Sequence, residues 1–174
     1  ILRPFAAGDA ARISRLAGDA AVADTTLRIP HPYTVEMASD WIDTHDTIRE
    51  KGIALFYAVC LREGGELIGS TGIDIDFPQG RAEIGYWIGQ EYWGKGYATE
   101  AAGRLMEYSF TELKLHKVTA HHFARNGASG RILEKLGMRR EGTLKEHIRQ
   151  SGKWEDIIQY GILEKEYQRP GPGL

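Results

Sequence analysis

The feature that most restricts the fold is a series of three apolar, β-branched runs, at residues 53–61, 66–77 and 82–89, separated only by the short sequences EGGE and PQG. Turns this short join antiparallel neighbours, because a parallel pair needs a crossover of a dozen or more residues. The pattern therefore predicts an antiparallel meander in the middle of the chain. Asp74 and Asp76 alternate with apolar residues in the second run, which favours a solvent-exposed sheet face for both carboxylates.

The meander is followed by the sequence GQEYWGKGYAT, at residues 89–99, and by a predicted amphipathic helix over residues 97–115. The match to the P-loop pattern G-x-x-x-x-G-K ends at Gly96, where a Ser or Thr is needed to bind magnesium. The dinucleotide pattern G-x-G-x-x-G fails at Thr99 and belongs after the first strand of a βαβ unit. Small residues before a helix N-terminus still favour a bound anion, so we expect a phosphate-bearing ligand. The alternative is that Gly94 and Gly96 only form a tight turn.

The flanking segments complete a mixed pattern of helices and strands. The predicted elements are a helix at 9–17, a proline-stiffened loop at 28–34, a helix capped by Thr34, a strand at 117–123, a helix at 128–137 and a hairpin within 138–167, around the turn QSGKW. We expect an α+β fold with a mixed, mostly antiparallel central sheet and helices on both faces. One domain spans residues 1–168, and the Pro- and Gly-rich tail 169–174 is expected to be disordered.

Composition argues against several classes of partner. No run approaches the ~18 apolar residues of a membrane span and no signal-peptide pattern is present, so we expect a cytoplasmic protein with no membrane partner. A net charge of -2 gives no electrostatic basis for binding nucleic acid. Cys60 is the only cysteine, which excludes a disulfide within the chain and favours a buried strand position. The histidines show no ligand spacing, and we predict no metal site.

Two motifs resemble those of a known family. The sequences YWIGQEYWGKGYATEA and NGASGRILEKLGM, separated by one predicted strand, are similar to the coenzyme-binding core of the GNAT N-acetyltransferases, in particular the RimJ/RimL branch of ribosomal-protein N-terminal acetyltransferases. Gly96 and Ala98 match the family pattern Q/R-x-x-G-x-G/A, whereas Trp93 replaces the usual Gln or Arg, a departure that we associate with this branch. The resemblance extends to RIPHPYT and Trp41, so it covers nearly the whole chain and implies the GNAT fold.

The resemblance implies that acetyl-CoA is the cofactor and that coenzyme A is a product. Backbone N–H groups would hold its pyrophosphate, with the Lys95 charge nearby, over the segment formed by Trp93, Gly94, Lys95, Gly96, Tyr97, Ala98 and Thr99. Free backbone groups for pantetheine would come from a strand end that splays from its neighbour, formed by Tyr86, Trp87 and Ile88.

Three residues of the second motif would contact the rest of the coenzyme. Asn126 would bond the pantetheine arm, although capping of the following helix is an equal alternative. Ser129 would lie near the thioester sulfur and could give a proton to the departing thiolate, because the tyrosine that many GNAT enzymes use as the acid is absent at this position. Arg131 would meet the 3′-phosphate, unless it is simply solvated.

Catalysis also needs a group that takes a proton from the amine. Glu83 lies in an otherwise apolar strand, where burial would raise its pKa and suit it to this role, directly or through a water. A structural carboxylate is the alternative. His121 and His122 are adjacent on a strand and point to opposite faces, so they cannot share a metal, and one of them would line the acceptor side as an alternative base. We assign His122, Tyr33 and Trp41 to acceptor binding, with core packing the alternative for Trp41.

The leading hypothesis is an acetyl-CoA-dependent N-acetyltransferase that acts on a protein N-terminus by direct attack in a ternary complex. An α-amino group has a reference pKa of about 7.7–8.0, against roughly 10.4 for lysine, so it is the easier amine to deprotonate. One alternative acceptor is a small amine, such as a polyamine, amino acid or antibiotic. Another alternative is a non-catalytic acyl-CoA sensor. Dimers are usual in the resembled branch, so a homodimer is left open.

Overall fold

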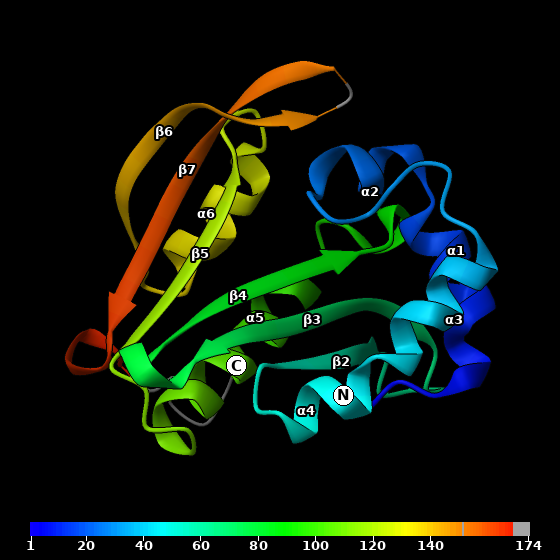
Figure 1. Ribbon diagram of the computed structural model, residues 1–174, viewed down its shortest axis with the longest axis horizontal. Helices are drawn as coiled ribbons and strands as arrows, with labels where there is room; N and C mark the ends of the chain where they lie inside the picture. Colours follow the sequence, from blue (N-terminus) through cyan, green and yellow to red (C-terminus); the bar gives the residue numbers. More distant parts are fainter. Residues whose placement is uncertain (151, 169–174) are drawn as a thin grey trace.

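A seven-stranded sheet forms the centre of the computed structural model, which describes residues 1–150 and 152–168. The strands lie in the order β1-β2-β3-β4-β5-β7-β6 (Figure 1). Their bounds are Leu2–Arg3 (β1), Ala54–Cys60 (β2), Leu67–Asp76 (β3), Arg81–Ile88 (β4), Lys117–Phe123 (β5), Arg139–Gln150 (β6) and Lys153–Leu163 (β7). The β4–β5 pair is parallel, and the other neighbours are antiparallel. The predicted α+β class with a mixed, mostly antiparallel sheet is confirmed.

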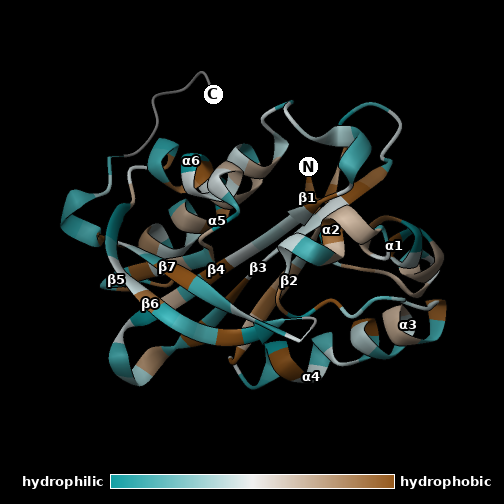
Figure 2. Ribbon diagram, turned by 90° about the horizontal axis from the view of Figure 1, so that it is seen from above, coloured by the Kyte–Doolittle hydropathy of each residue, from teal (hydrophilic) through white to brown (hydrophobic). Residues whose placement is uncertain are grey.

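Helices cover both faces of this sheet (Figure 2). Their bounds are Ala10–Ala17 (α1), Ala20–Thr25 (α2), Val35–Asp43 (α3), His45–Glu50 (α4), Tyr97–Thr111 (α5) and Gly127–Lys135 (α6). On one face α5 buries Met106 and Phe110 in a core that includes Val118 of β5. On the other face α1 packs through Ile13 in a cluster that includes Cys60 of β2, which is buried as expected. The apolar residues of α5 recur at helical spacing, which explains why it forms and which side it buries.

β4 and β5 separate soon after they begin. Residues 81–83 of β4 pair with residues 117–119 of β5, whereas β4 stays paired with β3 as far as Ile88 and β5 with β7 as far as Phe123. Figure 1 shows the two strands diverging, with β4 leading toward α1 and α2 and β5 running beside α6. Within the described residues, one edge of β4 from 84 to 88 therefore has no strand partner.

The cross-strand register sorts the side chains near this divergence onto two faces. Glu83 pairs with Asp74 on β3 and with Thr119 on β5, so these side chains share a face with His121, two residues beyond Thr119. Tyr86 has the opposite parity and packs against the core beneath α5. The residues that were predicted to act on the acceptor and on the thioester thus approach the gap from different faces of the sheet.

The N-terminal helices depart most from the predicted elements. The Thr34 hydroxyl caps α3 by accepting a hydrogen bond from the Met37 backbone N–H at 3.3 Å, as expected. The spacing of Met37, Trp41 and Ile42 predicts that all three lie on the apolar face of this helix, but Met37 is 43% exposed and does not. The short helices α2 and α4 were not predicted. The predicted tail at 169–174 and Ser151 of the QSGKW turn lie outside the described residues. Among the described helices, none combines the length and apolar character that crossing a bilayer requires.

Candidate active site

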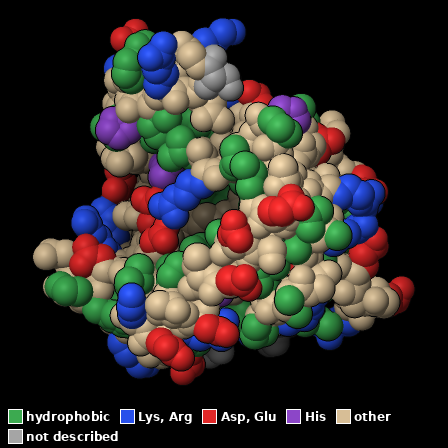
Figure 3. All heavy atoms as spheres, turned by 45° about the vertical axis from the view of Figure 1, so that its right-hand side comes forward, with side chains coloured by type: hydrophobic (Ala, Val, Ile, Leu, Met, Phe, Trp, Pro, Cys, Tyr) green, Lys and Arg blue, Asp and Glu red, His purple; other side chains and the backbone are tan. Residues whose placement is uncertain are grey.

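A cleft of about 800 Å³ begins at the N-terminus of α5, follows the divergence of β4 from β5 and reaches the segment between α2 and α3. Figure 3 shows a hollow of this surface with charged side chains of both signs around it. Most of the predicted site residues line the cleft, namely Tyr33, Trp41, Glu83, Tyr86, Trp87, Ile88, Trp93, Gly94, Gly96, Tyr97, Ala98, Thr99, His122, Asn126, Ser129 and Arg131. The two sequence motifs, separated by residues 102–125, are thus brought to one surface.

The glycine loop opens the cleft at the start of α5. Gly94 and Gly96 have φ values of +75° and +85°, a region that side chains rarely adopt, and a Cβ added at either would meet no atom within 4 Å. Gly96 is the N-cap of α5. Among the described residues, the backbone N–H groups of residues 94–99 have no hydrogen-bond acceptor, whereas that of Trp93 donates to the Gln90 carbonyl at 3.1 Å. Free amides at the positive end of a helix fit a pyrophosphate, but this cradle begins at Gly94 and not at Trp93.

The free edge of β4 continues from this cradle toward the centre of the sheet. Its last carbonyl, at Ile88, accepts a hydrogen bond from the Trp93 indole Nε1 at 2.6 Å. This bond ties the glycine loop to the strand and gives the unusual Trp93 a structural role. The unpaired stretch before it has the backbone donors and acceptors that an extended amide chain, such as pantetheine, can pair with as an added strand does.

Two predicted phosphate contacts have different outcomes. The Lys95 ammonium group does not line the cleft, since it donates to the Glu91 carbonyl at 3.2 Å and lies 5.4 Å from the centroid of the Tyr92 ring. The expected positive charge beside the pyrophosphate is therefore directed away from it. Arg131 and Lys135 lie on the side of α6 that lines the cleft, so their contact with a 3′-phosphate stays a prediction.

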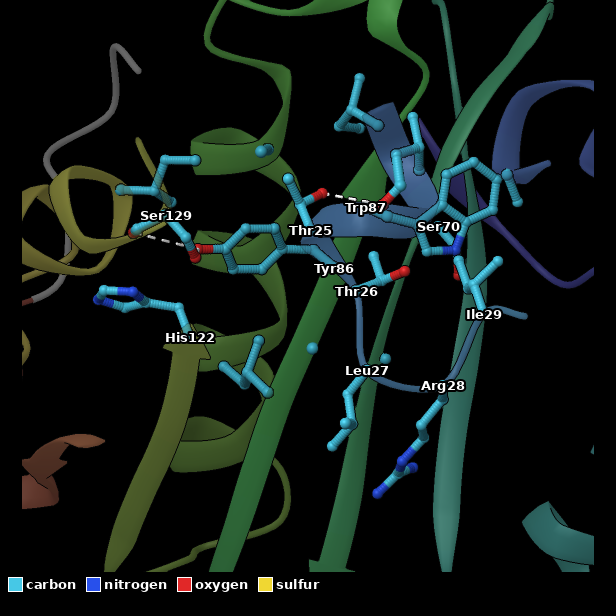
Figure 4. A pocket seen from close by; sticks show the side chains of 18 of the residues that line it. Thr25, Thr26, Leu27, Arg28, Ile29, Ser70, Tyr86, Trp87, His122 and Ser129 are labelled. Atoms are coloured by element: carbon cyan, nitrogen blue, oxygen red, sulfur yellow. Dashed lines mark hydrogen bonds between the residues drawn. The ribbon is translucent and has the colours of Figure 1, made fainter. Parts of the chain in front are cut away.

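Ser129 meets a partner that the sequence did not indicate. Its Oγ lies 2.9 Å from the Tyr86 hydroxyl, and Figure 4 shows Tyr86 reaching from β4 toward Ser129 on α6. Burial raises the pKa of Tyr86 to about 12, so its hydroxyl stays protonated and can donate to the Ser129 oxygen. A serine held in this way can direct its own proton toward a leaving thiolate. The alternation of β4 side chains was the only available signal for the pair.

Asn126 is the N-cap of α6, because its Oδ1 accepts a hydrogen bond from the Ser129 backbone N–H at 3.2 Å. Its amide NH₂ is still available to a ligand, so capping and binding can be separated by mutation. We expect Asn126→Ser to keep the cap, since serine caps about as well, and to weaken coenzyme A binding about tenfold through loss of one donor. Asn126→Ala should also lower the free energy of unfolding by about 1 kcal/mol. Urea unfolding and coenzyme titration measure the two effects. Unchanged affinity in Asn126→Ser would leave capping as its only role.

Glu83 contradicts the pKa shift expected from the sequence. Its carboxylate lies 3.1 Å from Nδ1 of His121, on the neighbouring strand. This hydrogen bond lowers the pKa of Glu83 and outweighs the opposing effect of burial. The prediction that burial would raise the pKa is therefore wrong, because the apolar residues around Glu83 in the sequence lie on the other face of the strand and a polar ring lies beside it. Glu83 is ionised near neutral pH and is a weak base.

The end of the cleft assigned to the acceptor is formed largely by residues 25–29, of which only Arg28 and Ile29 belong to the predicted loop at 28–34. Figure 4 shows this segment crossing in front of the strands, with the Arg28 side chain extending from it. The Arg28 guanidinium pairs with the Asp74 carboxylate at 3.0 Å. Tyr33 and Trp41 line the same end. Loop residues without periodicity give little sequence signal, which is why the segment was missed.

His122 lies on the opposite side of the gap from Glu83. Its Nδ1 hydrogen-bonds the Phe123 carbonyl at 2.8 Å, it is 7% exposed, and it packs against Gly130 of α6. Figure 4 shows its ring below Ser129. Its assignment to the acceptor side is therefore not supported by the geometry, and His121 is the histidine that faces the acceptor end.

The split sheet, the free amides at the start of α5 and the continuous cleft fit a protein that would hold a long phosphate-bearing ligand across its sheet, with one end of the ligand open to a second molecule. This is the architecture of a group-transfer enzyme. The chain belongs to the GNAT acetyltransferase family, since the model of the acetyltransferase (GNAT) domain matches residues 1–139. The recognition made from the two motifs is confirmed at the level of the superfamily.

Individual relatives agree with this assignment. The spermidine N(1)-acetyltransferase of Escherichia coli K12 is 31% identical over 166 residues, which cover 95% of this chain and 87% of the relative. YdaF of Bacillus subtilis, provisionally named a ribosomal N-acetyltransferase, is 33% identical over 105 residues, 60% of this chain and 57% of the relative. The crystal structure of a GNAT-family acetyltransferase from Bacillus anthracis has a TM-score of 0.84 at 30% identity and covers 95% of each chain. The protein is an N-acetyltransferase, and enzymes of this family use acetyl-CoA.

Proposed function

We propose that this enzyme transfers the acetyl group of acetyl-CoA to the α-amino group of a protein N-terminus, by direct attack in a ternary complex, as in the RimJ/RimL branch. The observation that carries the proposal is the single cleft that joins the free amides of residues 94–99 to the acceptor end beside Glu83. When bound, acetyl-CoA supplies the activated thioester. The free amides would donate hydrogen bonds to its pyrophosphate, the β4 edge would align its pantetheine arm, and Ser129 would give a proton to the sulfur.

The charges at the acceptor end favour an N-terminal amine over a polyamine. A polyamine carries several positive charges and is best recognised by carboxylates that lack other partners. Here Asp74 is paired with Arg28, and Glu83 with His121. A peptide N-terminus brings one charged amine of low pKa followed by neutral amide groups, which suits a surface whose charges are already balanced. The similarity to YdaF supports the same choice.

A second candidate acceptor is a polyamine, because the spermidine N(1)-acetyltransferase relative aligns over almost the whole chain. A peptide N-terminus and a polyamine are different acceptor molecules, so one assay with both kinds of acceptor distinguishes the two candidate functions. Release of coenzyme A thiol should be measured with N-terminal peptides of varied first residue, spermidine, spermine and free amino acids. We expect kcat/KM for the best peptide to exceed that for spermidine at least about tenfold, a difference of about 1.4 kcal/mol in transition-state stabilisation.

The same assay decides against the proposal in two ways. A preference for spermidine would establish the second candidate instead. Binding of coenzyme A, read as a thermal shift, without turnover of any amine would contradict both acceptors. A ligand at 100 times its Kd should stabilise the fold by about 2.7 kcal/mol, so binding is readily detected apart from turnover.

A further inference from the structure

A second cavity of about 500 Å³ adjoins the acceptor end of the cleft, on the face of the sheet that carries Glu83. Four carboxylates line it, and three of them are paired with Arg or Lys, as Arg28–Asp74, Arg81–Asp76 and Lys117–Glu141. The fourth, Glu83, is paired with His121. The cavity therefore contains one carboxylate whose partner is an imidazole ring and not the side chain of an Arg or Lys.

The geometry of this pair distinguishes its two nitrogens. Nδ1 of His121 is the atom that faces Glu83, so a proton on Nδ1 is donated to the carboxylate and Nε2 is left with a free lone pair. Among the described residues, Nε2 of His121 has no hydrogen-bond partner. The side chain is 29% exposed and lines both cavities, so it is accessible from the cleft and from the solvent-filled side.

We propose that Nε2 of His121 is the group that removes the proton from the acceptor amine, and that Glu83 positions this imidazole and does not itself take the proton. The proposal rests on the acetyltransferase function above. The base is then the imidazole and not Glu83, the residue whose apolar neighbours in the sequence predicted that role. A carboxylate that holds a histidine by one ring nitrogen fixes the tautomer and orientation of the ring and stabilises the imidazolium that forms.

The step balances without any further reactant. The ammonium form of the acceptor loses one proton to Nε2 of His121, and the neutral nitrogen then attacks the thioester carbonyl carbon. A C–N bond forms, the C–S bond breaks with its electron pair going to sulfur, and the thiolate is protonated from Ser129. The nitrogen of the adduct gives its second proton through water to the serine oxygen, which restores the serine hydroxyl and leaves a neutral amide. The imidazolium releases its proton to solvent through the second cavity, which is lined with polar side chains.

The proposed base and the proposed acid lie on opposite faces of the sheet, so proton removal from the amine and proton donation to the thiolate occur at separate places. His121 and Glu83 project on the face of α1–α4, whereas Ser129 approaches from α6 with Tyr86. The nucleophile and the leaving group lie on different sides of the carbonyl that reacts, so the base and the acid need to lie apart as well. Gln159 of β7 lies opposite His121 in the sheet. The charged residues that line the second cavity with His121 are Asp74 and Asp76 of β3, Arg81 and Glu83 of β4, Lys117 of β5, Glu141 of β6 and Arg28 after α2.

The decisive variant is His121→Asn, because asparagine has an amide nitrogen at the position of Nδ1 and can still donate to Glu83 but cannot accept the proton. We expect kcat to fall about 10²–10³-fold, the typical contribution of a general base. The thermal shift with coenzyme A should be unchanged, and the loss of kcat should shrink at high pH, where the acceptor amine is already neutral.

Glu83→Ala should lower kcat about tenfold, as expected when a supporting group is removed, and should keep the acid limb of the pH profile of kcat/KM. His147→Asn, on the exposed surface of β6, is the matched control and should behave as wild type.

Each other outcome overturns a defined claim. If His121→Asn stays within threefold of wild type while wild type turns over, the imidazole is not the base. If Glu83→Ala loses the acid limb of the pH profile, the carboxylate is the base and this proposal is wrong. If wild type acetylates no amine although coenzyme A binds, the proposed function fails and the present proposal fails with it.

Discussion

Gly96→Val should weaken coenzyme A binding at least about 100-fold, equivalent to about 2.7 kcal/mol of binding free energy. Two effects act together. The φ of +85° at the N-cap of α5 is strained for a β-branched residue, which should cost the fold about 1–3 kcal/mol. The valine side chain would also project into the open space over the free amides, because no atom lies within 4 Å of its Cβ position. Isothermal titration with coenzyme A measures the loss.

The matched control is Gly64→Val in the turn between β2 and β3. Gly64 has a φ of +74°, and its Cβ position is equally open, but it does not line the cleft. Both variants should lose similar stability, whereas only Gly96→Val should lose coenzyme binding. Gly96→Ala, with a smaller side chain, covers the case in which the valine variant fails to fold, and it should still bind about tenfold more weakly than wild type. Wild-type affinity in both Gly96 variants would show that the pyrophosphate is held elsewhere.

Acid should lower the free energy of unfolding of this protein through protonation of the buried His45 ring. His45 is buried in contact with the rings of Phe5, Trp41 and Phe56, and neither of its ring nitrogens has a hydrogen-bond partner in the described structure. Burial lowers its pKa from 6.5 to about 4, and the nearby Arg49 charge acts in the same direction. Because the unfolded chain binds the proton more tightly, stability is fully present above pH 6.5 and is lost as pH falls toward 4.

The loss at pH 4 should be roughly 3 kcal/mol, at about 1.4 kcal/mol for each unit of pKa shift. Urea unfolding of wild type and His45→Phe between pH 7.5 and 4 tests this. The substituted protein should lack most of the decline in unfolding free energy between pH 6.5 and 4, whatever its stability at neutral pH. Exposed His147→Phe is the control and should decline as wild type does. Parallel curves for wild type and His45→Phe would show that another group causes the acid sensitivity. The carboxylate pKa shifts, such as that of Asp9 beside Arg3, act at lower pH.

Elements with strong local signals were predictable from sequence. The meander followed from short turns, and the glycine loop from its two closely spaced glycines before an apolar helix. The structure confirms both, with left-handed φ values at Gly94 and Gly96. The helices α2 and α4 were missed because each is one to two turns long, too short for a 3.6-residue period to appear. The prediction for Met37 was wrong for a related reason. A single apolar residue in the first turn of α3 can match the helical spacing of apolar residues without being buried.

The backbone segments that form the site could be predicted from the sequence, whereas the interactions between its side chains could not. The residues that line the cleft came mostly from the two motifs, because loop and cap geometry is local. The Glu83–His121 and Tyr86–Ser129 pairs join residues 38 and 43 positions apart in sequence. Only the register of β4 against β5, and the approach of α6 to the gap, brings them together. The direction of the Glu83 pKa shift depended on such a pair, and so it could not be inferred from its neighbours in the chain.

The parting of β4 from β5 also has a consequence for the order of events in a catalytic cycle. Three residue pairs join the two strands, and beyond them no strand pairing connects β4 to β5 in the described residues. A donor molecule that lies along residues 84–88 would pair with this free edge. It would then form part of the surface that the amine contacts. This fold therefore favours binding of the donor before the acceptor. Release of the coenzyme would remove part of the surface that binds the acceptor.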